Sequence, residues 1–219
     1  MIKKLSQAAS LALSLACLLH FSSCSNGESV ENSRWQNIRG RDDKTNPRAP
    51  IYRAKIPLAW ILNDLHRNES ITDTTKPLCE LLIKEDQESI RITIHNFPVS
   101  NFNERIPPAA QIARWKRQFD FLDPTTIAVT PQAFGGFCGV VFEGRGQIQG
   151  LEVAVMGWSM QLGSEHYYAL NQLSSLSKQM QADYTIKAVG NPELIEKHRE
   201  AILAFARTFE LIEEIPSNS

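Results

Sequence analysis

The sequence has no excess of basic residues, because 23 lysines and arginines are balanced by 24 aspartates and glutamates, giving a formal net charge of −1. Nucleic-acid-binding domains carry clustered positive charge, so this balance argues against a nucleic-acid partner. The chain also has no internal repeat and no apolar run long enough for a transmembrane helix, which needs about 20 mainly apolar residues. A single globular domain outside the bilayer is therefore expected.

Motifs for catalysis and metal binding are also missing. Residues 157–161, GWSMQ, lack the last glycine of a nucleophile elbow. The glycine-rich residues 144–150 do not match the dinucleotide-binding pattern and lie between two expected strands, which favours a hairpin turn. The histidines show no metal-ligand spacing. We therefore expect no metal, no cofactor and, as the main hypothesis, no enzyme activity.

An apolar segment is present at the N-terminus. Two lysines precede an apolar stretch from about Leu5 to Phe21, and small serines follow it, as in a secretory signal peptide. Residues 21–24, Phe-Ser-Ser-Cys, resemble a bacterial lipobox, in which the cysteine is lipidated and becomes the first mature residue. Phe21 departs from the leucine that is usual there. The alternative is an ordinary signal peptide that leaves Cys24 as a thiol.

The lipobox resemblance implies a lipoprotein held at the bacterial envelope membrane by palmitate or a similar acyl chain on Cys24. Ser25, in place of aspartate, resembles the sorting preference of outer-membrane lipoproteins, so we expect an outer-membrane protein that faces the periplasm. Beyond the cysteine, residues 25–50 offer only four apolar side chains, Val30, Trp35, Ile38 and Ala49, too few to offset the ordering entropy. We therefore assign 1–23 to the signal peptide, 24–50 to the lipidated cysteine and a flexible tether, and 51–219 to one α+β domain.

Two cysteines, Cys79 and Cys138, lie within this domain. An exported protein folds in a compartment that permits disulfides, so the two could pair. The sequence does not show whether their Cα atoms come within about 7 Å, the reach of a disulfide. Two buried thiols that do not pair are the alternative.

The domain is predicted to be mostly β-structure. Alternating apolar and polar residues, together with turn signals, predict strands near 51–56, 79–84, 89–97, 126–130, 134–143, 148–162, 167–170 and 183–189. Proline and capping signals predict helices over 107–122 and 192–209, and apolar spacing predicts a short one within 171–181. On these helices, we interpret Trp115 and His198 as core residues, with ligand binding as the alternative for Trp115.

The two ends of the domain resemble the PsbP-like superfamily. Residues 51–60, IYRAKIPLAW, are similar to its opening strand, proline and tryptophan, and the strand at 184–186 with the long helix closing on Phe209 is similar to its ending. The resemblance implies a mostly antiparallel sheet flanked by helices, an α/β/α sandwich. It also implies a habit of binding proteins, with no shared catalytic residues.

Two functional hypotheses stay open. The anchor, the tether and the resemblance favour a non-catalytic module that binds an envelope protein or a small ligand. The alternative is an envelope cysteine hydrolase in which His166 activates Cys138, because a nearby imidazole favours the reactive thiolate. No sequence feature places these two side chains together.

Overall fold

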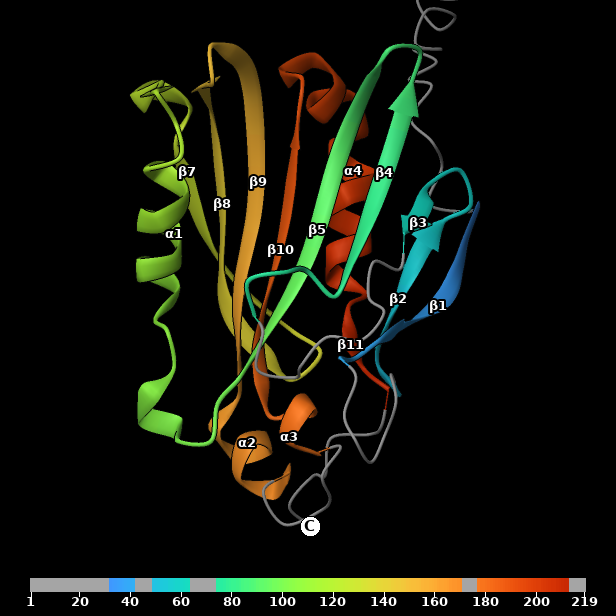
Figure 1. The fold of residues 1–219 in the computed structure, drawn as a ribbon, viewed down its shortest axis with the longest axis vertical. Helices are drawn as coiled ribbons and strands as arrows, with labels where there is room; N and C mark the ends of the chain where they lie inside the picture. Colours follow the sequence, from blue (N-terminus) through green and yellow to red (C-terminus); the bar gives the residue numbers. More distant parts are fainter. Residues whose placement is uncertain (1–31, 42–48, 64–73, 171–176, 213–219) are drawn as a thin grey trace, which may run out of the picture.

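A large antiparallel sheet forms the centre of the molecule, and a smaller sheet lies to one side of it (Figure 1). The structure is a computed structural model that describes residues 32–41, 49–63, 74–170 and 177–212. The large sheet has the strand order β3-β4-β5-β10-β9-β8-β6, and β7 pairs with the part of β8 that precedes its contact with β6. The small sheet has the order β1-β2-β11.

The elements have the following bounds. The large sheet contains β3 (Ile61–Asn63), β4 (Cys79–Glu85), β5 (Glu88–Pro98), β6 (Phe121–Leu122), β7 (Ala128–Phe134), β8 (Phe137–Ile148), β9 (Leu151–Leu162) and β10 (Ala182–Gly190). The small sheet contains β1 (Ser33–Arg39), β2 (Pro50–Pro57) and β11 (Glu210–Leu211). The described α-helices are α1 (Pro108–Lys116), α2 (Ser164–Leu170), α3 (Ser177–Met180) and α4 (Pro192–Arg207), and short 3-10 helices span Phe102–Glu104 and Pro124–Thr126.

Helices cover both faces of the large sheet. Trp158 of β9 belongs to the core that contains Ile202 and Phe205 of α4. The neighbouring Gly157 instead approaches Trp115 of α1. Because successive residues of a strand point to opposite faces, α1 and α4 lie on opposite sides of the sheet. The predicted α+β fold, a mostly antiparallel sheet flanked by helices, is confirmed, with the small sheet packed beside α4 through β2.

Local sequence signals account for several boundaries. Gln149 and Gly150 have φ values of 54° and 77°, so residues 144–150 contain the predicted hairpin turn between β8 and β9. At the start of α4, the Asn191 side chain accepts hydrogen bonds from the backbone N–H groups of Glu193 and Leu194. This cap, followed by Pro192, begins the helix where the sequence predicts it.

Several predicted elements differ from the structure. The strand predicted at 134–143 contains the turn at Gly135 and Gly136 that separates β7 from β8. The helix over 107–122 ends at Lys116, and residues 121–122 form β6, because the chain hydrogen-bonds to β8 on both sides of it. The strand predicted at 167–170 is wrong, since these residues belong to α2, where the Tyr167 N–H donates to the Gly163 carbonyl at 2.9 Å. The helix predicted within 171–181 is described only as α3, and 171–176 lie outside the described residues.

The flexible tether predicted for residues 24–50 is wrong over 33–41. Ser33–Arg39 forms β1, which pairs antiparallel with β2. Ile38 is 1% exposed and belongs to the main core, and the Arg41 N–H donates to the Gln179 Oε1 at 2.8 Å. One buried apolar side chain and a ladder of backbone hydrogen bonds therefore order a segment whose composition is mostly polar.

The predicted signal peptide and lipobox lie in residues 1–31, outside the part of the chain that the structure describes. Among the described helices, none has the length and apolar character needed to cross a bilayer.

No disulfide joins Cys79 and Cys138. They lie on β4 and β8, with β5, β10 and β9 between them. Four strand spacings of about 4.8 Å separate them by roughly 19 Å, well beyond the roughly 7 Å that a disulfide spans between Cα atoms. The possible pairing is therefore wrong. Of the two thiols, Cys79 is buried, whereas Cys138 is exposed.

Ile38→Ala is expected to lower the free energy of unfolding by about 2–5 kcal/mol, because it removes a fully buried side chain from the core. Asn37→Ala, at the exposed neighbouring position on the same strand, is the matched control and should change it by less than about 0.5 kcal/mol. Urea denaturation of the full chain measures both values. Equal, small effects of the two substitutions would show that β1 is not part of the folded domain.

Candidate functional site

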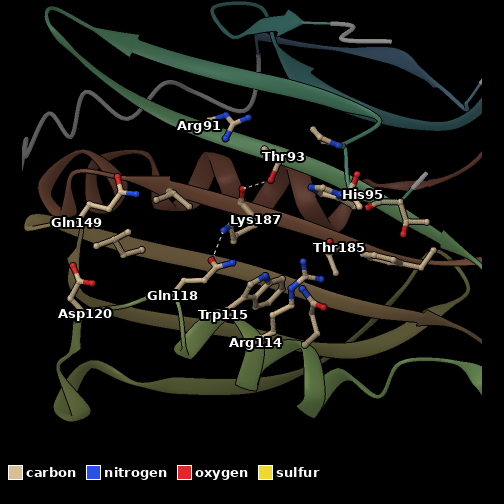
Figure 2. Close-up of a pocket in the computed structure, with 17 residues that line it drawn as sticks. Arg91, Thr93, His95, Arg114, Trp115, Gln118, Asp120, Gln149, Thr185 and Lys187 are labelled. Atoms are coloured by element: carbon tan, nitrogen blue, oxygen red, sulfur yellow. Dashed lines mark hydrogen bonds between the residues drawn. The ribbon is translucent and has the colours of Figure 1, made fainter. Parts of the chain in front are cut away.

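An open cavity of about 820 Å³ lies on the face of the large sheet that α1 covers only in part (Figure 2). We call this cavity the groove. Strands β5 and β10 form its floor, and α1 forms one wall. The floor presents Thr93, His95, Thr185 and Lys187, and the wall presents Gln111, Arg114 and Trp115.

The strand register arranges the floor in rows. Listed from β5 through β10 to β9, two neighbouring rows are Thr93-Lys187-Gly157 and His95-Thr185-Ser159. Residues two apart on a strand face the same side of a sheet. Both rows therefore direct their side chains toward the groove face, while the residues between them face α4.

A glycine on β9 positions α1. A Cβ atom at residue 157 would lie 2.5–2.9 Å from three atoms of the Trp115 ring, so the ring occupies the space of the missing side chain. Trp115 is 4% exposed, and its ring centroid lies 6.5 Å from that of Phe142. The helix therefore packs over β8 and β9 and leaves the floor on β5 and β10 open. The interpretation of Trp115 as a core residue is confirmed, and the residue also lines the groove.

Positive charge predominates in the described lining of the groove. Lys187, Arg91 and Arg114 line it, and Asp120 is the one acidic residue among the described lining residues. The Asp120 carboxylate lies at the turn between β8 and β9, where it accepts a hydrogen bond of 3.2 Å from the Gly150 N–H. The acidic group is thus engaged at one end of the groove.

The three cations differ in their partners. Arg91 forms an ion pair with Glu80 of β4. Lys187 donates from Nζ to the neutral Oε1 of Gln118 at 2.9 Å. Within the described part of the chain, neither Lys187 nor Arg114 has a carboxylate partner. Burial lowers the pKa of Lys187, and the positive charges of Arg91 and Arg114 lower it further.

His95 adds no charge to the groove at neutral pH. Burial lowers its pKa to about 4; the backbone hydrogen bond to Thr74 opposes this shift, and the positive charges of Arg41, Lys187 and Arg114 reinforce it. Its Nδ1 lies 3.4 Å from the Thr74 carbonyl oxygen, which can only accept, so Nδ1 is the donor in this contact. The positive character of the groove therefore comes from lysine and arginine side chains.

A second cavity of about 170 Å³ adjoins the groove, and Gln111 and Thr185 line both. Asp183 lines this smaller cavity, where the Arg105 Nε donates to both carboxylate oxygens at 3.0 Å. The Leu162 N–H also donates to Asp183 at 3.1 Å. Glu104 also lines this smaller cavity and has no cationic partner in the described part of the chain. The combined cavity is thus positive at the Lys187 end and negatively charged at the end near Asp183 and Glu104.

The residues of the hydrolase hypothesis do not form a pair. Cys138 lies on β8 and His166 on α2, and among the described residues no hydrogen bond joins them. The Nδ1 of His166 is buried and has no hydrogen-bond partner in the described chain. His198 lies in the core as predicted, with Nε2 2.7 Å from the Glu85 Oε1.

No group of three or more His, Cys, Asp and Glu side chains in the described residues is placed to hold a metal ion. Cys24, the predicted lipidation site, lies outside the described residues.

Sequence reasoning missed the groove. The alternation around Arg91, Thr93 and His95 identifies the polar positions of β5. The nearby sequence does not indicate which strand or helix lies next to these side chains. The pairing that places Lys187 beside Thr93 joins strands far apart in the chain. The available signal was that β5 and β10 each alternate apolar residues with polar or basic ones, which predicts a sheet face with two polar strands.

No family model and no curated protein matches this chain. Similar solved structures include LpqN of Mycobacterium tuberculosis, which is involved in cell envelope biogenesis, with 11% identity over 82% of this chain and 91% of LpqN and a TM-score of 0.49. Cyanobacterial PsbP from Synechocystis has 10% identity, coverage of 82% and 93%, and a TM-score of 0.46. A protein of unknown function from Pseudomonas aeruginosa has 11% identity, coverage of 85% and 99%, and a TM-score of 0.42.

Proposed function

We propose that this protein is a lipid-anchored protein of the bacterial envelope whose α+β domain binds a small ligand or a segment of a partner protein in the groove, without catalysis. The open cavity of about 820 Å³ supports this proposal most directly. Its volume falls within the roughly 300–1,000 Å³ that is typical of ligand sites.

The composition of the floor also supports binding. Lys187 is half-buried between β5 and β9, and an ammonium group without an anionic partner is costly to desolvate. Ionisable groups with perturbed pKa values concentrate at functional sites, which favours a role for Lys187 in recognition.

The chemistry of the described lining favours binding over catalysis. An activated nucleophile needs a base within hydrogen-bond reach. The Thr93 hydroxyl instead donates to the backbone carbonyl of Lys187 at 3.5 Å, and the His95 Nδ1 contacts a backbone carbonyl. These side chains supply donors and acceptors for a ligand.

The anchor belongs to the same proposal. The lipobox resemblance supports a lipid on Cys24, and the polar Ser25 favours the outer membrane facing the periplasm. Eight residues lead from Cys24 to Asn32, where the described chain begins, and they reach at most about 28 Å. A lipid on Cys24 would therefore hold the domain close to the membrane surface.

Photo-crosslinking in cells tests the binding site. p-Benzoylphenylalanine in place of Gln118, which lines the groove, is expected to give a light-dependent adduct with the bound molecule. The same amino acid in place of Glu200, whose side chain is 83% exposed on α4, is the matched control and should not give that adduct. No adduct from position 118, or the same adducts from both positions, would refute binding in the groove.

Metabolic labelling with an alkyne fatty acid tests the anchor. The wild-type chain is expected to take up the label, and Cys24→Ala is expected to lose it, because the acyl chain is attached through that cysteine. Cys138→Ala removes the exposed thiol of the domain and should keep the label. Equal labelling of wild type and Cys24→Ala would rule out the lipoprotein assignment.

A further inference from the structure

We infer that the groove recognises an oxyanion, a phosphate or carboxylate group carried by a small ligand, which binds between Lys187 of β10 and Arg114 of α1. This inference rests on the proposed function, because it specifies the chemistry of the ligand that the groove binds.

The first argument is uncompensated charge. An ammonium group has three donors, and Lys187 uses one of them for Gln118. Arg114 has no hydrogen bond or ion pair within the described residues. Several arginines elsewhere in the domain do pair: Arg145 donates to Glu196 at 2.7 Å, and Arg199 donates to Glu143 at 2.9 Å. Arg34, Arg117 and Arg207 also have no ion pair among the described residues, but none of them lines the groove. The groove therefore brings together two cations that have no carboxylate partner.

The second argument is the placement of the cations. In Figure 2, Lys187 lies between Arg91 on the β5 side and Arg114 on the α1 side. The charges of both arginines act on Lys187. An oxyanion bound here would offset this repulsion, since a guanidinium offers a planar fork of donors to it and an ammonium offers a point charge.

The third argument concerns the rest of the ligand. The Thr185 hydroxyl and the Gln111 side-chain amide have no hydrogen-bond partner in the described part of the chain, and both residues line the groove and the smaller cavity. They lead from the cations toward Asp183, whose charge is matched by Arg105. The smaller cavity also contains the carboxylate of Glu104, which has no cationic partner among the described residues. A ligand with its oxyanion at the Lys187 end and a polar body without further negative charge therefore fits the combined cavity.

Isothermal titration of the full chain in non-ionic detergent, at constant ionic strength, tests this inference. The probes are inorganic phosphate, glucose 6-phosphate and glucuronate, with glucose as the neutral match. We expect binding of an oxyanion and none of glucose. Comparison of glucose 6-phosphate with glucuronate identifies which oxyanion is preferred. Comparison of inorganic phosphate with glucose 6-phosphate shows whether the sugar adds affinity.

Substitutions of Lys187 and Arg114 test whether these two cations bind the oxyanion. Lys187→Gln and Arg114→Gln are each expected to weaken oxyanion binding about tenfold or more, because a charge-assisted hydrogen bond is lost. Arg114→Lys, which keeps the charge, should retain most of the affinity. Lys178→Gln, an exposed position on α3 with the same change of charge, should leave the affinity unchanged.

If the wild-type chain binds none of the three oxyanions, or if wild type and both glutamine variants bind them with equal affinity, the inference is wrong. Arg114 is exposed on α1, so its variants keep the test valid even where Lys187→Gln does not fold. If position 118 still crosslinks to a ligand while the oxyanion tests fail, the inference is wrong and the proposed function stands. If the crosslink is also missing, the proposed function itself is wrong.

Discussion

The contact between the Trp115 ring and the backbone of Gly157 determines which part of the large sheet α1 covers and which part stays open as the groove floor. Because the indole fills the space of a missing side chain, α1 packs over β8 and β9, where Ile112, Phe142 and Val155 complete a separate apolar cluster. The same helix then presents polar side chains to the open half of the sheet. One packing contact thus both completes this cluster and forms a wall of the groove.

Strands β5 and β10 contribute to the core on one face and form the groove floor on the other. Their apolar residues, such as Ile92 and Ile186, are fully buried on the α4 side. The residues between them, such as Thr93 and Lys187, face the groove. The stability of the apolar face therefore fixes the positions of the polar groups, because a strand whose alternate residues are locked in a core cannot rotate. A rigid floor of this kind holds donors in place for a ligand.

Local patterns predicted much of the fold and little of the site. The hairpin at Gly150 and the start of α4 at Asn191 follow from turn and cap chemistry that acts within a few residues. β1 was not predicted because Ile38 is its one buried apolar residue, and the strand is ordered by pairing with β2. The groove was not predicted because its charged residues come together only in the folded chain. The register of distant strands places Lys187 beside Thr93, and the packing of α1 on the sheet brings Arg114 to the same cavity.

The role of the Trp115 contact is tested most directly by ¹⁹F NMR of the chain labelled with 5-fluorotryptophan, in wild type and in Gly157→Ala. The added methyl group would overlap with the indole ring of Trp115, so the ring must move. We predict a large shift of the Trp115 resonance, assigned with Trp115→Phe, and little change for Trp35 on the small sheet. An unchanged Trp115 resonance in Gly157→Ala would show that this contact does not position α1 and does not define the groove.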